Sequence, residues 1–195
     1  MKDKIGIGFI GTGFARRVQI PAFLMCSGVD VVSVASASLE NAESTAREFE
    51  IAHFTNDWRE TIDHEDVDLV CITTPPTLHF EQAMYAIAKG KHVLCEKPMA
   101  MNSAEAAKMT EAARERGVLA LIDHELRFQG GRLKAYQMLR NGEIGTIRHV
   151  KYIFRNAQRG NPDVRWNWWS DADQGGGTLG AIGSQTGGSI NRPAS

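Results

Sequence analysis

The stretch VLCEKPMA, residues 93–100, places two charges and a proline directly after an apolar run. Charges at the end of a buried strand are costly unless something uses them. Pro98 bars Lys97 from helical backbone angles and holds it extended. Because neighbouring strand residues point to opposite faces, we expect Glu96 and Lys97 to face different ways. An ammonium group in a partly dry crevice can orient a substrate oxygen or move a proton, whereas the plainer interpretation is a surface ion pair.

Short apolar, β-branched runs predict the elements that must position these residues. Such nearly continuous runs are typical of strands that are covered on both faces. They occupy residues 5–10, 30–36, 67–74, 91–96 and 118–123. Between them, residues 77–89 carry one apolar helical stripe, and residues 103–116 follow Asn102, with Glu105 completing a capping box. A further helix is expected after the last run, at about residues 130–140. This alternation predicts an α/β fold with a doubly wound parallel sheet.

A glycine-rich turn follows the first strand in one of two registers. The literal G-x-G-x-x-G spacing falls on Gly6, Gly8 and Gly11, but it leaves only MKDKI as the strand before it. That register also puts two glycines inside the apolar run. The alternative register, beginning at Gly11, follows the strand and opens the helix, and we prefer it.

In the preferred register the turn has the features of a dinucleotide site. Gly11 would permit the tight turn, and Gly13 would let a pyrophosphate approach the start of a helix near Phe14. The third position of the motif is then Arg16, next to the small Ala15. Similar turns also occur in α/β proteins that bind no dinucleotide, so the motif favours this function without deciding it.

The second strand ends at Ser36, where NAD enzymes usually place Asp or Glu to hold the ribose 2′-hydroxyl. No carboxylate there would repel a 2′-phosphate. Arg16 and Arg17 could neutralise such a phosphate, or they could be solvated surface residues. The sequence therefore favours NADP slightly over NAD.

Three stretches make the chain resemble the Gfo/Idh/MocA family of oxidoreductases over about residues 4–184. They are IGTGFARRVQIPAF, CITTPPTLHFEQAMYAIAKGKHVLCEKPMA and GGGTLGAIGS. The resemblance implies an NAD(P)-binding Rossmann domain, residues 1–123, and the beginning of a mixed-sheet α/β substrate domain, residues 124–184. It also implies NAD(P)-dependent oxidation or reduction of a sugar, cyclitol or related polyol, and a homo-oligomer for the complete protein.

The resemblance assigns roles to individual residues. Lys97 matches the catalytic lysine of the family, and His124 and Arg127 are expected at the margin of the substrate site. Without the resemblance, His79 would be an exposed histidine at a helix start. Cofactor contacts are implied for Gly11, Thr12, Gly13, Phe14, Ala15, Ser36, Thr73, Thr74, Pro75, His79, Glu96 and Lys97. Asp123, His124 and Glu125 lack the i, i+4 histidine pair of a zinc site, so no metal is expected.

The second domain departs from the family pattern near residue 181. Ala181 and Gln185 stand where the family usually has Asp and His, and an amide cannot exchange a proton near neutral pH. We expect a C-terminally truncated or frame-shifted form of a longer enzyme, inactive as this fragment, with a natural short protein as the alternative. The strand predicted over residues 148–156 and the tryptophans of RWNWW would then pack against a part that is absent.

Composition restricts the function further. The net charge of −1 gives no basic footprint for nucleic acid, and no apolar run reaches the about 18–20 residues of a membrane span. No signal peptide is evident, and the three cysteines are expected to be reduced and buried, so we expect a cytoplasmic protein. The glycine-rich stretch from residue 175 onward, above all the tail 185–195, is expected to be disordered. A non-catalytic NAD(P)-binding module, acting as a sensor or partner subunit, remains the rival interpretation.

Overall fold

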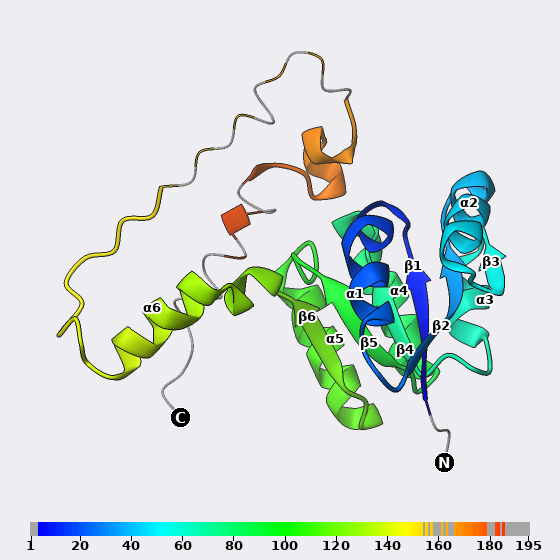
Figure 1. The fold of residues 1–195 in the computed structure, drawn as a ribbon, viewed down its shortest axis with the longest axis horizontal. Helices are drawn as coiled ribbons and strands as arrows, with labels where there is room; N and C mark the ends of the chain where they lie inside the picture. The colour runs from blue at the N-terminus through cyan, green and yellow to red at the C-terminus, as the bar shows by residue number, and fades with distance from the viewer. Residues whose placement is uncertain are drawn as a thin grey trace.

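The computed structural model describes residues 4–153, 155, 157, 161, 163, 166–178, 182–183 and 185. Its strands form one parallel sheet in the order β3-β2-β1-β4-β5-β6 (Figure 1). The strands are β1 Ile5–Ile10, β2 Val29–Ala35, β3 His53–Thr55, β4 Leu69–Ile72, β5 His92–Glu96 and β6 Ala120–Asp123. The doubly wound sheet predicted from the sequence is confirmed. Because β1 pairs with both β2 and β4, the strand order reverses between β1 and β4, where such folds bind ligands.

Helices connect the strands, and the sequence located three of them correctly. The helices predicted over 77–89, 103–116 and about 130–140 are α4 Pro76–Ala88, α5 Ser103–Arg116 and α6 Gly130–Arg140. The capping box of α5 is also present, because the Glu105 amide donates to Asn102 Oδ1 at 2.9 Å. The others are η1 Ala15–Gln19, α1 Ile20–Leu24, α2 Leu39–Phe49, α3 Trp58–Asp63, η2 Glu125–Phe128, η4 Trp168–Ser170 and η5 Ala172–Gln174. Within the described ranges, no helix is long and apolar enough to cross a membrane.

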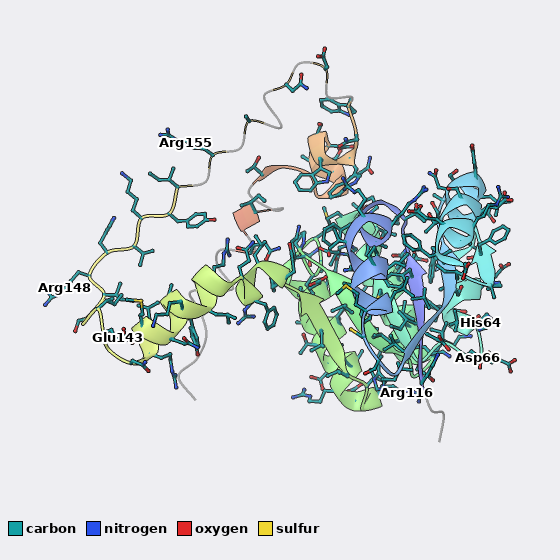
Figure 2. The ribbon with its side chains drawn as sticks, viewed as in Figure 1. His64, Asp66, Arg116, Glu143, Arg148 and Arg155 are labelled. Carbon is teal, nitrogen blue, oxygen red and sulfur yellow. The ribbon has the colours of Figure 1, made fainter. Side chains whose placement is uncertain are left out.

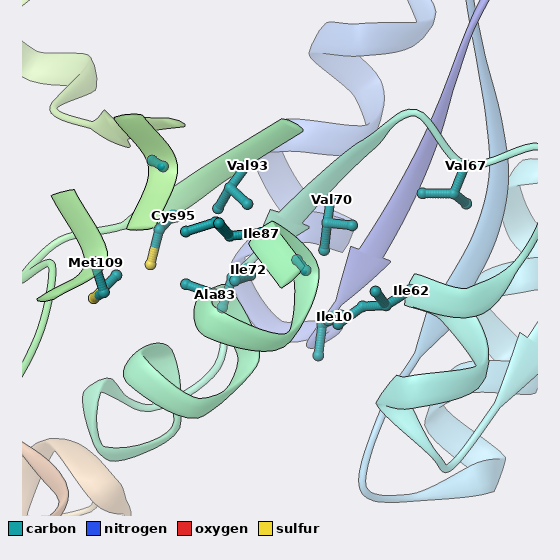
Figure 3. Close-up of a cluster of buried hydrophobic side chains, with 12 residues drawn as sticks. Ile10, Ile62, Val67, Val70, Ile72, Ala83, Ile87, Val93, Cys95 and Met109 are labelled. Carbon is teal, nitrogen blue, oxygen red and sulfur yellow. The ribbon is translucent and has the colours of Figure 1, made fainter. Parts of the chain in front are cut away.

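Two apolar clusters hold helices against the two faces of the sheet. On one face, side chains of α3, α4 and α5 pack against β1, β4 and β5. Figure 3 shows this cluster, in which Val70 and Ile72 of the sheet lie near Ala83 and Ile87 of α4. On the other face, α1 and α2 cover β1 and β2. Burial on both faces explains why these strands read as continuous apolar runs.

The sheet has an open edge at β6. Leu119 and Leu121 expose 58% and 50% of their surface there. From β6, α6 extends away from the sheet, and the chain continues past Glu143 and Arg148 before it returns at η4 (Figures 1 and 2). These two apolar side chains therefore lack cover from the described part of the chain.

The strand predicted over residues 148–156 is not observed in residues 148–153 or 155. Val150, Tyr152 and Ile153 alternate with polar residues but remain exposed. A strand needs backbone hydrogen bonds to a neighbour, and within the described residues none joins this segment to another strand. Alternation in the sequence indicated a strand without indicating its partner.

The expected disorder from residue 175 onward is wrong for the part that is described. The amides of Gly175, Gly176 and Gly177 donate to carbonyl groups of residues 169–172 at 2.9–3.0 Å. A Cβ atom added to Gly175 would lie 2.6 Å from Pro76, so this turn packs against the start of α4. Backbone hydrogen bonds order the turn, and composition does not report them. The tail 186–195 and Ala181 lie outside the described residues.

The three cysteines differ in burial, and the structure shows all three as free thiols. Cys71 and Cys95 are buried as expected, but Cys26 is exposed. Its apolar surroundings in the sequence belong to the end of α1, and Cys26 itself lies in the turn between α1 and β2. Burial raises the pKa of the Cys71 and Cys95 thiols.

Candidate active site at the switch point of the sheet

The turn after β1 forms at Gly11, in the register preferred from the sequence. Gly11 has a φ of +96°, and its amide donates to the Ala35 carbonyl group at 2.8 Å. A Cβ atom there would lie 2.7 Å from Thr73 Oγ1 and 2.9 Å from the Thr73 carbonyl group. Thr73 Oγ1 in turn donates to the Gly11 carbonyl group at 2.9 Å. The loops after β1 and β4 are thus joined where the strand order reverses.

Gly13 leaves open space, which suits a bound dinucleotide. A Cβ atom at Gly13 would meet nothing within 4 Å, and its φ is not in the left-handed region. The protein therefore does not need glycine there for its own packing. An open backbone at the start of a helix, beside the end of β1, is the cradle that a pyrophosphate requires. The residues present fit the cofactor that the sequence predicts.

Polar side chains border this cradle on the β2 side. Thr12 Oγ1 donates to Ser36 Oγ at 3.3 Å, which joins the turn to the end of β2. Arg16 is held by α2, since its Nε lies 2.5 Å from Glu48 Oε2. Arg17 stays beside the turn, where its Nε donates to the Gly13 carbonyl group at 3.2 Å. Of the two arginines, Arg17 is the one placed to meet a ligand at Gly13.

A pocket of about 160 Å³ opens beside Gly13. It brings together the loops after β1, β4 and β5 and the returning η4 segment. Its lining residues are Gly13, Phe14, Arg17, Thr73, Thr74, Glu96, Lys97, Trp168 and Trp169. Six of these nine are among the cofactor contacts that the resemblance implies, and Arg17 is one of the two arginines considered for a 2′-phosphate. The remaining three, Arg17, Trp168 and Trp169, come from the helix start and from a segment that the sequence did not connect with this site.

Glu96 and Lys97 meet in this pocket, contrary to the expectation that they face different ways. Lys97 Nζ lies 3.9 Å from Glu96 Oε2, and the two side chains expose only 14% and 10% of their surface. The reason is that β5 ends at Glu96, so Lys97 lies beyond the strand and the alternation of strand side chains does not apply to it. The pair is not a surface ion pair.

Behind Lys97, Glu96 belongs to a buried polar cluster. Gln19 Nε2 donates to Glu96 Oε1 at 3.2 Å and to Asp123 Oδ2 at 2.7 Å. Burial and the neighbouring charge of Asp123 raise the pKa of Glu96 to about 8, although Lys97 opposes this shift. Gln19 was not identified from the sequence, because a glutamine within a helix carries no signature of its contacts.

His79 is fully buried rather than exposed at the start of α4. Its Nδ1 lies 2.8 Å from the Pro98 carbonyl oxygen, and its Nε2 lies 2.8 Å from the Thr74 carbonyl oxygen. Burial lowers its pKa, against the effect of these two contacts. His79 does not line the pocket, but it joins the loop after β4 to the turn that carries Lys97. Pro75, the N-cap residue of α4, lies in the same loop.

His124 and Arg127 lie next to this cluster without lining the pocket. Burial lowers the pKa of His124, and the charges of Arg127 and Lys97 act in the same direction. Gln185 is buried, and its Nε2 donates to Glu125 Oε2 at 2.6 Å, so the end of the described chain packs beside this strand end. Among the described residues, no group of His, Cys, Asp and Glu is arranged to hold a metal ion.

Two of the tryptophans in RWNWW also reach the site. Trp168 and Trp169 are half-buried, with ring centroids 5.1 Å apart, and Lys97 Nζ lies 5.8 Å from the Trp169 ring. We expected them to pack against an absent part of the protein. Instead, the turn at residues 175–177 holds η4 over the pocket, while Trp166 remains 79% exposed.

Comparison with known proteins agrees with this geometry. Residues 5–124 match the model of an oxidoreductase family with an NAD-binding Rossmann fold, and residues 133–185 match the GFO/IDH/MocA C-terminal domain. The chain belongs to the Gfo/Idh/MocA family. The family binds NAD(P), and the fold is a Rossmann-like α/β sheet followed by a partial C-terminal domain.

Relatives and solved structures extend the comparison. A 1,5-anhydro-D-fructose reductase of Ensifer adhaerens is 37% identical over 75% of this chain and 45% of its own length. An oxidoreductase domain protein from Kribbella flavida superposes with a TM-score of 0.86 at 30% identity, over 96% of this chain and 52% of that one. A 3-ketoreductase from Actinomadura kijaniata in complex with NADP superposes with a TM-score of 0.69 at 30% identity, over 74% of this chain and 46% of that one. The chain spans about half the length of these relatives.

Proposed function

We propose that this chain forms the cofactor-binding part of an NAD(P)-dependent oxidoreductase that acts on a CH–OH group of a sugar or related polyol. One observation carries the proposal. A nearly buried lysine, Lys97, opens into the same pocket as the open backbone of Gly13. A dinucleotide and a proton-transferring side chain would then share one small space.

The residues of the switch point would hold the cofactor. The turn Gly11-Thr12-Gly13 would take the pyrophosphate, Ser36 would face the adenosine ribose, and Thr73 and Thr74 would border the nicotinamide side. The remaining cofactor contacts proposed are those of Phe14, Ala15, Pro75, His79, Glu96 and Lys97, with His79 acting through the two carbonyl groups that it contacts. When bound, the nicotinamide would accept or donate the hydride.

Lys97 would act on the substrate oxygen. Its ammonium group lies in a site with little solvent, where a hydrogen bond to a hydroxyl or carbonyl oxygen is stronger than in water. The ammonium group can therefore orient that oxygen and donate a proton to it, and a lysine that has given up a proton can accept one from it. We place His124 and Arg127 at the substrate margin, because both lie next to the Lys97 cluster without lining the pocket.

Relatives support the substrate class and the cofactor. The relative from Ensifer adhaerens is a reductase of an anhydro sugar, and the structure from Actinomadura kijaniata contains NADP. Ser36 offers no carboxylate to repel a 2′-phosphate, and Arg17 remains available near the turn. Arg16 is already paired with Glu48, so it supports NADP less than the sequence implied. We infer NADP in preference to NAD.

Turnover of 1,5-anhydro-D-fructose with NADPH tests the proposal. Lys97→Met should reduce the rate by about 100-fold or more while NADPH still binds, because the methylene stem is kept and the ammonium group is lost. Lys108→Met is the matched control, since Lys108 is an exposed lysine of α5. Equal rates for Lys97→Met and wild type would refute the catalytic role.

A non-catalytic NAD(P)-binding module is the second candidate. Gln185 favours it, because the position where the resemblance implies a histidine holds an amide that donates to Glu125. This candidate predicts NADPH binding without turnover of any sugar or polyol, and unchanged binding in Lys97→Met.

We also infer the division into a Rossmann domain, residues 1–123, and the start of a substrate domain, residues 124–184. The abrupt departure of the chain from the sheet after β6 supports this division (Figure 1). Exposed apolar residues on β6 support assembly into a homo-oligomer in the complete protein. The free thiols support a cytoplasmic location.

A further inference from the structure

Glu96 has surroundings that a cofactor contact alone does not explain. The residue is 8% exposed and lies at the end of β5. Its two oxygens have different partners. Oε1 accepts from Gln19, which also donates to Asp123, whereas Oε2 accepts from the Lys97 amide at 3.3 Å and lies 3.9 Å from Lys97 Nζ. One oxygen thus faces a second carboxyl group, and the other faces the lysine of the pocket.

The charges around Glu96 favour a carboxyl group that holds a proton near neutral pH. Asp123 at the end of β6 and Glu125 in η2 are like charges facing it, and Lys97 is the opposing positive charge. Gln19 is the only donor that Glu96 and Asp123 share among the described residues, and its own Oε1 has no hydrogen-bond partner there. Two nearby carboxylates with one neutral donor between them are costly in a buried site, so one of them keeps its proton.

We propose that Glu96 is the proton-exchange partner of Lys97, and that Gln19 and Asp123 are positioning residues that hold Glu96 where it can change its protonation state. The inference rests on the proposed function, because it supplies a destination for the proton that the substrate releases. Glu96 and Lys97 would then act together in one proton transfer.

Oxidation of the substrate removes one hydride and one proton, and the relay gives the proton a destination. In the oxidation direction, the substrate O–H bond would break and its electron pair would become the second bond of the carbonyl group, while a bound nicotinamide would accept the hydride from the carbon. The Lys97 ammonium group would pass one of its protons to Oε2 of Glu96, and the nitrogen lone pair freed in this way would take the substrate proton. Lys97 keeps its charge, and the Glu96 carboxylate becomes a neutral carboxyl group. Reduction runs the same transfers in reverse.

Among the polar groups around this cluster, Gln185 cannot take the place of Glu96 in the relay, because its amide cannot exchange a proton near neutral pH. A group with a pKa of about 8 is present in both forms near neutrality, so Glu96 can accept and return a proton. Asp123 is half-buried and lies on the outer side of Glu96, toward the edge of the sheet.

Infrared spectroscopy of the full chain tests the relay without turnover. The carbonyl stretch of a protonated carboxyl group should disappear as the pH rises through about 8 in wild type, and it should be missing from Glu96→Gln. Glu40→Gln, an exposed position in α2, is the matched control and should keep the band. Asp123→Asn should keep the band but move its titration to lower pH, because a like charge is removed.

Kinetics provide the second readout. With 1,5-anhydro-D-fructose and NADPH, Glu96→Gln should lower turnover by about 100- to 10,000-fold and remove the limb of the pH profile near 8. A wild-type chain without the titrating band, or a Glu96→Gln variant with wild-type rate and pH profile, would overturn the relay. If Lys97→Met still abolished turnover in that case, the proposed function would stand without the relay. If wild type bound no NADPH, the proposed function itself would fail.

Discussion

Replacing Glu96 by Gln should flatten the dependence of stability on pH. In the folded chain, burial and Asp123 raise the pKa of Glu96 from 4.5 to about 8. The folded state therefore keeps a proton that the unfolded state releases above 4.5. Because the raised pKa favours folding at low pH, stability falls as the pH rises from 4.5 toward 8.

Linkage gives the size of this effect. For these two pKa values, the free energy of unfolding decreases by about 2–3 kcal/mol between about pH 5 and about pH 7 through Glu96 alone. Glutamine does not titrate, and its Oε1 can still accept from Gln19. Glu96→Gln should therefore lack this decrease while other groups continue to contribute equally to both proteins.

Urea unfolding followed by tryptophan fluorescence at several pH values measures the difference. The quantity to compare is the change in free energy of unfolding between the two pH values, wild type minus variant, with Glu40→Gln as the exposed control. A variant whose stability falls with pH as steeply as wild type would show that Glu96 is ionised in the folded chain. The structural account of the Gln19 cluster would then be wrong.

Three further substitutions or reagents test the local geometry. Gly11→Ala should lower the free energy of unfolding by about 1–3 kcal/mol, since a φ of +96° and the approach of Thr73 leave no room for a Cβ atom; an unchanged urea midpoint would contradict this. Asn102→Ala should lower the free energy of unfolding by about 1 kcal/mol, because it removes the cap of α5. Urea unfolding followed by circular dichroism would measure this decrease. Iodoacetamide should label Cys26 in the folded chain and reach Cys71 and Cys95 only after unfolding, and early labelling of either buried thiol, seen by mass spectrometry, would argue against their burial.

The sequence predicted most of the sheet because both of its faces are buried. Continuous apolar runs marked β1, β2, β4, β5 and β6, and cap residues marked the start of α5. The three-residue strand β3, His53–Thr55, was missed, because it is too short to show a pattern and only one of its residues is buried. For residues 148–153, by contrast, the sequence predicted a strand that is not observed. The alternation of apolar and polar residues is present there, but no partner strand lies among the described residues.

The candidate site was predicted where its residues are close in the sequence. Local sequence alone located Gly11, Gly13 and the charged pair Glu96 and Lys97 at the end of β5. Gln19 could not be found in this way, because its partners Glu96 and Asp123 are 77 and 104 residues away. Trp169 was expected to pack against an absent part of the protein, because no sequence pattern shows where the chain beyond α6 returns to the fold.

Calorimetric titration of the full chain with NADPH tests the central claim most directly, in wild type and in Gly13→Val. A Cβ atom at Gly13 meets nothing within 4 Å, so a valine side chain would extend into this open space and fill the cradle for the pyrophosphate. The account predicts that wild type binds NADPH and that Gly13→Val does not, with the urea midpoint unchanged. Binding of equal strength in Gly13→Val, or a wild-type chain that binds neither NADPH nor NADH, would contradict it.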